Sequence, residues 1–199
     1  MKIALCGASG SGKSTLARWM SKKWDTPYIE NSAGLILPPE VQERFVRQYG
    51  WTKSGHRDVI RLGNQNPAFA LEFQIELLKV RNKFINDNPS FIFDRSPVDN
   101  LAYFLLQCGH LSTNDAAREH IENCIKAAKK LDGIIFLHTS TNHEEIENNG
   151  SRVDNWYYQL MVTAVFKHVM ETYMKHVESI EITTWDYATR QRLITNFIA

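Results

Sequence analysis

The sequence predicts an α/β domain in which a parallel β-sheet is covered by helices on both faces. Short apolar runs alternate with longer helical segments along the chain, the pattern of a layered α/β fold. Several of these runs are continuously apolar, which is typical of strands buried on both faces. With 199 residues, the chain is long enough for one substantial core and too short for two, so we expect a single domain over residues 1–199.

The order of the expected elements follows from turn signals and helical spacing. Strands are expected at residues 2–6, 26–30, 90–93, 133–138 and 179–184. Helices are expected at residues 15–24, 39–46, 67–86, 97–105, 114–131, 156–176 and 188–198. The polar, glycine-punctuated residues 49–55 are expected to form a mobile connection. Five polar segments follow the carboxyl ends of the strands, where parallel sheets bind ligands: residues 7–14, 30–39, 94–99, 139–152 and 184–187.

Composition excludes several classes of protein. Lys and Arg number 23 against 22 Asp and Glu, so the net charge of +1 gives no global attraction for nucleic acid, which we do not expect as a partner. No apolar run approaches the roughly 18 residues of a membrane span, so no membrane partner is expected. Three cysteines suit a reducing compartment, and the first strand begins too early for a signal peptide. We therefore expect a cytoplasmic protein.

One segment carries the strongest chemical signal. The residues Gly7-Ala8-Ser9-Gly10-Ser11-Gly12-Lys13-Ser14-Thr15 match the pattern G-x-x-x-x-G-K-[ST], the P-loop, between an expected strand and an expected helix. Its glycines let backbone N–H groups and a helix N-terminus approach phosphate groups closely. Lys13 is expected to reach the β- and γ-phosphates of a nucleoside triphosphate, and the Ser14 hydroxyl to bind Mg²⁺. The predicted nucleotide-binding residues are Gly7, Ser9, Gly10, Ser11, Gly12, Lys13, Ser14 and Thr15.

A second acidic group is expected near the triphosphate. Asp94 and Arg95 come directly after a buried strand, at the sheet edge that the P-loop shares. There Asp94 could hold a Mg²⁺-bound water or accept the proton of an acceptor hydroxyl, and Arg95 could clamp a phosphate. The alternative is an ordinary ion pair beside a helix that Ser96 caps. With the P-loop present, we favour the catalytic interpretation.

A later polar segment is expected to act as a lid. Residues 139–155 lie between an expected strand and a long helix, and they include Asn149-Gly150-Ser151-Arg152. Arg152 could stabilise the charge that develops on a transferred phosphoryl group, and Arg18 could contribute. The alternative is a solvated loop with a surface arginine.

The acceptor substrate is expected to lie against residues 30–88. Gln74 and Arg81 share one face of the third predicted helix, where an amide suits a base edge and a guanidinium suits a carbonyl or a phosphate. A polar helix flank is the alternative. Further candidates for the acceptor site are Tyr28, Glu30, Arg44 and Phe73, the last as a ring that stacks on a base.

These motifs together resemble the nucleoside and nucleotide kinase branch of P-loop proteins. The resemblance rests on residues 7–15, on the run from Phe93-Asp94-Arg95-Ser96-Pro97-Val98-Asp99 through Asn100-Leu101-Ala102-Tyr103, on Asn149–Arg152 and on Glu72-Phe73-Gln74 through Arg81. More narrowly, the chain is similar to the small deoxynucleoside monophosphate kinases of bacteriophages. It is also similar to the kinase domain of nicotinamide-nucleotide adenylyltransferase/ribosylnicotinamide kinases.

The resemblance implies a strand order of 2-3-1-4-5, an ATP·Mg²⁺ donor and a lid that carries the catalytic arginine. It implies that Asp94 and Arg95 handle the acceptor, that Gln74 and Arg81 read its base, and that residues 184–187, with Asp186, contact the donor adenine. Many nucleotide kinases supply two or three lid arginines, whereas this chain offers one, Arg152. A viral relative would act in the cytoplasm of its host, and the oligomeric state, a homodimer included, is left open.

The sequence therefore leads to a kinase hypothesis with two alternatives. We expect transfer of the γ-phosphoryl group of ATP to a deoxynucleoside monophosphate, with Lys13, Asp94, Arg95 and Arg152 as catalytic residues and with Ser14 and Asp94 at Mg²⁺. One alternative is a kinase for a nucleoside, ribosylnicotinamide or a nucleic-acid 5′ hydroxyl. The other is a nucleotide-dependent switch or adaptor without phosphotransfer.

Overall fold

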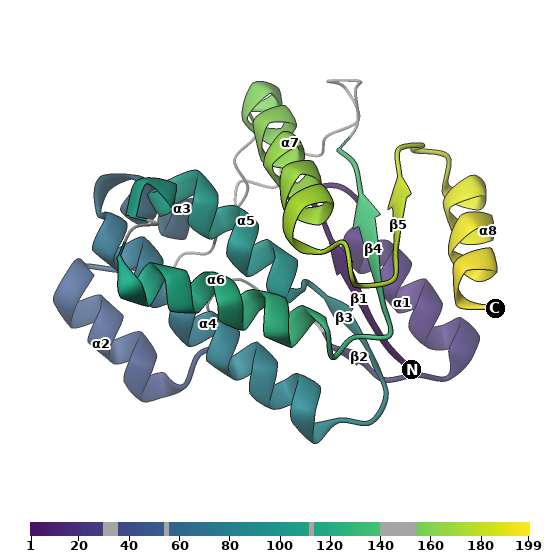
Figure 1. Cartoon of the computed structure of the whole chain (residues 1–199), viewed down its shortest axis with the longest axis horizontal. Coiled ribbons are helices and arrows are strands. Elements are labelled where there is room, and N and C mark those ends of the chain that lie inside the picture. The colour runs from purple at the N-terminus through teal and green to yellow at the C-terminus, as the bar shows by residue number, and fades with distance from the viewer. Residues whose placement is uncertain (30–35, 54–55, 112–113, 140–154) are drawn as a thin grey trace.

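A five-stranded parallel sheet forms the centre of the molecule. A computed structural model of the chain describes residues 1–29, 36–53, 56–111, 114–139 and 155–199 (Figure 1). The strands are β1 (Lys2–Cys6), β2 (Tyr28–Ile29), β3 (Phe91–Asp94), β4 (Gly133–Leu137) and β5 (Ser179–Ile182). All neighbouring strands run parallel, in the order β2-β3-β1-β4-β5. The predicted α/β class and the strand order 2-3-1-4-5 are confirmed.

Helices connect the strands and cover the sheet. They are α1 (Lys13–Trp24), α2 (Pro39–Tyr49), α3 (His56–Gln65), α4 (Pro67–Asp87), α5 (Pro97–Cys108), α6 (Asp115–Ala128), α7 (Trp156–Tyr173) and α8 (Tyr187–Ile198). A short 3₁₀ turn, Gly109–Leu111, follows α5. The helix starts obey simple local rules: Asn66, Ser96, Asn114 and Asn155 each cap a helix with a side-chain oxygen. Among the described helices, none combines the length and the apolar character that crossing a membrane requires.

The sequence did not predict α3, and the mobile connection expected at residues 49–55 is wrong for the part that the structure describes. Trp51 is 1% exposed, because its ring fits among other aromatic rings. The Thr52 backbone N–H and hydroxyl both donate to the Asp58 carboxylate in the first turn of α3, at 2.8 and 2.7 Å. Glycine is a poor helix former, but at Gly63 its lack of a side chain lets the Gln107 amide pack close to α3, where a Cβ would lie 2.4 Å from it and would displace it.

Alternate residues of the central strands face two different layers. On one face, Ile3, Leu5, Ile135 and Leu137 pack against α1 and α8. On the other face, Ala4, Cys6, Ile134 and Phe136 pack with residues of α4, α5, α6 and α7 (Figure 1). This is why the strands read as continuous apolar runs in the sequence: neither face of the sheet meets water.

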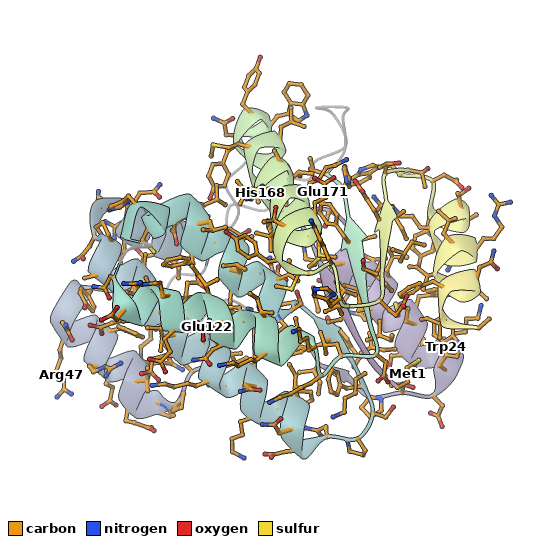
Figure 2. All side chains as sticks on the ribbon, in the orientation of Figure 1. Met1, Trp24, Arg47, Glu122, His168 and Glu171 are labelled. Atoms are coloured by element: carbon orange, nitrogen blue, oxygen red, sulfur yellow. The ribbon has the colours of Figure 1, made fainter. Side chains whose placement is uncertain are left out.

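A separate aromatic cluster holds α2 and α3 against α4, away from the sheet. Phe45, Trp51, Phe69 and Phe73 are its fully buried rings, with centroid separations of 5.4 to 6.4 Å for the contacts among them. The opposite side of α2 meets solvent, and Arg47 projects outward from it (Figure 2). This cluster fixes where one end of α4 lies, and α4 carries two of the predicted acceptor-site residues.

Strand register brings the carboxyl ends of β1, β3 and β4 to one edge of the sheet. Leu5 pairs with Asp94, and Cys6 pairs with Phe136. The P-loop follows β1 directly, and Asp94-Arg95 lies at the end of β3. Segments more than 80 residues apart in sequence therefore meet here.

Truncation of Phe45 tests the role of the aromatic cluster. The Phe45→Ala variant is expected to lower the free energy of unfolding by about 3–5 kcal/mol, because it leaves a cavity among packed rings. Val46→Ala, one residue later on the exposed side of α2, is the control and is expected to change it by less than about 0.5 kcal/mol. Urea denaturation measures both. Equal small losses would show that the cluster is not a tightly packed core.

Candidate active site

The loop between β1 and α1 takes a shape that requires glycine. Gly7 has φ of +135°, and a Cβ there would lie 2.2 Å from the Leu137 carbonyl oxygen. Gly12 has φ of +86° and precedes the first turn of α1, whose backbone N–H groups have no intrahelical acceptors. A loop that curls closely around a helix N-terminus binds anions well. The predicted residues Ser9, Gly10, Ser11 and Thr15 all belong to this loop or to the first turn of α1.

Lys13 is buried in this loop. Its ammonium group donates to the carbonyl oxygens of Gly7 (2.9 Å) and Ala8 (2.6 Å) and to the Ser11 hydroxyl (3.2 Å). Burial, and to a smaller extent the nearby Arg95 guanidinium, lower the Lys13 pKa to about 7, although the Asp94 carboxylate acts in the opposite direction. A triphosphate would supply the negative charge that this buried cation lacks.

Asp94 joins the P-loop to β3. The Ser14 hydroxyl donates to Asp94 Oδ2, and the Tyr28 hydroxyl approaches the same oxygen at 3.4 Å. Asp94 Oδ1 is buried and has no hydrogen-bond partner among the residues that the structure describes. A buried carboxylate oxygen without a partner favours a ligand or an ion, and hydroxyl and carboxylate oxygens are donors that Mg²⁺ accepts. The predicted pair Ser14 and Asp94 therefore fits a Mg²⁺ site.

Arg95 is fixed in an uncommon backbone conformation beside Asp94. Its φ of +131° is strained for a residue with a side chain, which is a feature of functional sites. The guanidinium forms an ion pair with Asp99 Oδ1 at 2.9 Å. Burial by itself lowers the Arg95 pKa, but Tyr103 and the Asp99 and Asp94 carboxylates raise it above the usual value. Arg95 is therefore a permanent cation held in one place.

A cavity opens on the side of Arg95 away from the sheet, between α3, α4 and α5. The atom-free space between its lining side chains, counted together with the open solvent at its mouth, is about 390 Å³. One part of its wall is apolar, and the other carries amide, guanidinium, carboxylate and phenol groups. The lining residues are Val59, Ile60, Phe73, Gln74, Leu77, Arg81, Arg95, Asp99, Tyr103 and Gln107.

Gln74 and Arg81 are joined within this wall by a third residue, Asn100. Arg81 Nη1 donates to Asn100 Oδ1 at 2.5 Å and to the Ser96 carbonyl at 3.2 Å. Asn100 Nδ2 donates to the backbone and side-chain oxygens of Gln74, both at 3.1 Å. Burial lowers the Arg81 pKa to about 10, so Arg81 still carries its charge at neutral pH.

The structure brings most of the predicted site residues together, with four exceptions. Tyr28 contacts Asp94, and Phe73, Gln74, Arg81 and Arg95 line the cavity. Arg44 instead pairs with Glu76 at 3.3 Å and does not line the cavity, so its role as a substrate ligand stays a prediction without geometric support. Asp186 caps α8 by accepting from the Thr189 backbone at 2.7 Å. Glu30 and Arg152 lie outside the described residues, as does nearly all of the predicted lid.

Arg190 is a site residue that sequence patterns offered no reason to choose. It is 3% exposed, and it donates to carbonyl oxygens of three segments: Thr184 (2.6 Å), Ser11 in the P-loop (2.7 Å) and His138 after β4 (3.3 Å). Its guanidinium also lies 4.7 Å from the centre of the Trp185 ring. In the sequence, Arg190 looks like any other cation of a helix. Only the tertiary structure shows that it connects the P-loop to the end of the sheet.

A comparison with known protein families assigns the chain to one of them. A family described as an AAA domain matches residues 2–190, nearly the whole length. The chain belongs to this AAA domain family. No curated protein matches the sequence. The family match agrees with the P-loop, one of the four segments on which the predicted kinase resemblance rests.

Solved structures share the fold at low sequence identity. Deoxyadenosine kinase from M. mycoides with bound dCTP superposes with a TM-score of 0.64 at 18% identity, covering 100% of this chain and 98% of that one. The YorR protein of Bacillus subtilis, in complex with phosphorylated GDP, gives 0.57 at 16% identity, covering 98% and 94%. The NadR protein in complex with NR gives 0.54 at 12% identity, covering 98% of this chain and 50% of that one. The predicted P-loop kinase fold is confirmed, whereas a link to bacteriophages stays a prediction.

Proton uptake on ATP binding tests the electrostatic state of Lys13. At pH 8 a lysine with a pKa of about 7 is mostly neutral, whereas a bound triphosphate favours its charged form. Binding of metal-free ATP is therefore expected to be accompanied by the uptake of up to about one proton from solution. Calorimetry in buffers of different ionisation enthalpy measures the uptake. Lys13→Met should abolish uptake, and Lys22→Met, at an exposed position of α1, should preserve it. No uptake by the unchanged protein would contradict the lowered pKa.

Replacement of Arg190 tests whether it shapes the P-loop. Arg190→Met removes a buried cation from three carbonyl oxygens. The variant is expected to bind ATP about tenfold or more weakly, and its free energy of unfolding is expected to fall by about 2 kcal/mol. Arg192→Met, at an exposed position of the same helix, is the control. Calorimetric titration with ATP and thermal unfolding measure the two effects. Unchanged ATP affinity would show that Arg190 only stabilises the fold.

Proposed function

We propose that this protein transfers the γ-phosphoryl group of ATP to a deoxynucleoside monophosphate. One observation carries the proposal: the P-loop and the cavity meet at two consecutive residues. Asp94 accepts a hydrogen bond from Ser14 of the P-loop, and the next residue, Arg95, lines the cavity. A donor on one side and an acceptor on the other would thus face each other across Asp94-Arg95, which is the arrangement that direct phosphoryl transfer needs.

The donor side fits ATP and Mg²⁺. Lys13 and the backbone of residues 7–14 would hold the phosphates, and Ser14 and Asp94 would hold the metal ion, which neutralises negative charge on the phosphates when it is bound. Arg152 would supply a further positive charge from the lid, and Asp186 would lie near the adenine. The protein's own contribution is then positioning and charge stabilisation.

The acceptor side favours a flat, anionic ligand. Val59, Phe73 and Leu77 offer an apolar wall suited to the faces of a base. Arg81 and Arg95 bring two positive charges to the lining and Asp99 one negative charge, so the net charge of the described lining is positive. That balance suits an acceptor that carries a phosphate better than a neutral one. Tyr28 and Glu30, beside the carboxyl end of β2, would flank its reacting end.

A nucleoside is the second candidate acceptor. The buried oxygen of Asp94 that lacks a partner among the described residues could take a proton from a 5′-hydroxyl, a step that a phosphate acceptor does not need. The similar fold of a deoxyadenosine kinase and of a protein in complex with NR also supports a nucleoside or ribosylnicotinamide. An ATP-to-ADP assay with and without acceptors separates both kinases from a nucleotide-dependent switch, because only a kinase is stimulated by one acceptor.

Replacement of Asp94 distinguishes a monophosphate from a nucleoside acceptor. Asp94→Asn removes a general base, which typically contributes about 10²–10⁴-fold to the rate, so the loss with a nucleoside should exceed the loss with a monophosphate by at least about tenfold. Asp94→Asn also weakens the metal site, which lowers the rate with both acceptors alike. The ratio of the two losses in rate therefore reports proton abstraction alone. Steady-state kcat/KM with each acceptor gives the ratio. Equal losses would exclude Asp94 as a general base.

A further inference from the structure

The amide of Gln74 has a fixed orientation, which follows from the chemistry of its neighbours. An arginine side chain can only donate hydrogen bonds. Arg81 Nη1 lies 2.5 Å from the Asn100 amide, so the atom of Asn100 that faces it must be the oxygen. The NH₂ group of Asn100 then faces Gln74, and it lies 3.1 Å from the Gln74 side-chain oxygen. Because the donor-only arginine starts the chain, each amide can point in one direction only.

As a result, Gln74 offers the cavity an NH₂ group whose donors are unused, while its oxygen already accepts one hydrogen bond. Its oxygen is engaged by Asn100, and its NH₂ group has no acceptor among the described residues. Gln74 is 4% exposed and lines the cavity, so a ligand there would meet this NH₂ group. An amide that recognises a base through both of its ends turns its oxygen and its NH₂ group toward the base, and here the oxygen is turned toward Asn100, so the NH₂ group is the end that remains fully available.

The neighbouring polar groups on this part of the wall are engaged with one another, and the Tyr103 hydroxyl oxygen accepts from Arg95. Asp99 Oδ2 accepts from the Ser96 backbone N–H (2.8 Å) and hydroxyl (3.0 Å), and its Oδ1 pairs with Arg95. Arg81 and Arg95 are themselves donors. Gln107, seven residues after Asn100 on α5, lies about 10 Å further along the helix and packs against Gly63 of α3.

We propose that the Arg81–Asn100–Gln74 network selects acceptors whose base presents a carbonyl oxygen at this edge, and that Asn100 is the residue that sets this preference. Thymine and uracil present O4 and guanine presents O6, all of which accept hydrogen bonds. Adenine and cytosine present an amino group at the same place, which would face the Gln74 NH₂ group as donor against donor. This inference rests on the proposed function and names the class of base that it uses.

Asn100→Asp reverses the side-chain part of the network at nearly constant size, although it also replaces the donor that Asn100 Nδ2 gives to the Gln74 backbone carbonyl at 3.1 Å with an acceptor. A carboxylate can only accept, so one oxygen of the introduced carboxylate would still face Arg81 and the other would require the NH₂ group of Gln74. The Gln74 amide would then turn and present its oxygen to the cavity. Asn86→Asp is the matched control, since Asn86 is exposed on α4 and its oxygen already accepts from Lys130 at 2.9 Å.

The experiment compares kcat/KM for dTMP, dUMP and dGMP with that for dAMP and dCMP, and it repeats the comparison with the corresponding nucleosides. The unchanged protein and Asn86→Asp should prefer the carbonyl bases by about tenfold or more, and Asn100→Asp should lose or invert this preference. A preference for amino bases, no preference, or an unchanged preference in a folded Asn100→Asp variant would overturn the inference.

A second variant keeps the test decisive if Asn100→Asp does not fold. Gln74→Glu keeps the oxygen that Asn100 contacts and removes the NH₂ group, so it should lose activity on carbonyl bases by about tenfold or more with a smaller loss on amino bases. Equal losses on both classes would overturn the inference. Lack of phosphate transfer from ATP to every acceptor would instead overturn the proposed function itself.

Discussion

The hydrogen bond between Ser14 and Asp94 is the contact on which the rest of the site depends. It joins the first turn of α1 to the end of β3, two segments that the parallel register of β1 and β3 brings to the same edge of the sheet. Because Arg95 follows Asp94 directly, this bond also sets the position of the cavity relative to the P-loop. Any shift of β3 along β1 would therefore alter the P-loop contact and the position of the cavity at once.

The wall of the cavity is built from buried polar groups that satisfy one another. Asp99 caps α5 and holds Arg95, while Asn100 links Arg81 to Gln74. Buried groups of this kind are costly when unpaired, so a network in which donors meet acceptors is rigid. The rigidity extends to α2 and α3, because the rings of Phe45 and Trp51 pack against Phe73 on α4. The edge that carries Gln74 and Arg81 and the side that packs on the aromatic cluster thus belong to one helix, α4.

Sequence patterns predicted most of the fold because its signals are local. Short apolar runs, continuous in β1, β3 and β4, indicated the five strands, and Pro near the first turn indicated α2, α4 and α5. Helix α3 escaped prediction because Gly63 and a polar first turn hide a buried face that forms only against Gln107 and the aromatic cluster. Arg190 escaped because its three acceptors come from segments 6, 52 and 179 residues away.

The sequence by itself determined the P-loop, the acidic-arginine pair after β3 and the face of α4 that carries Gln74 and Arg81, because each depends on residue type at fixed short spacing. Only the tertiary structure decided that Asp94 contacts Ser14, that Arg190 ties down the loop and that Asn100 lies between Gln74 and Arg81. These are relations between distant segments. The direction in which an amide points depends on its neighbours in space, and residue spacing does not reveal those neighbours.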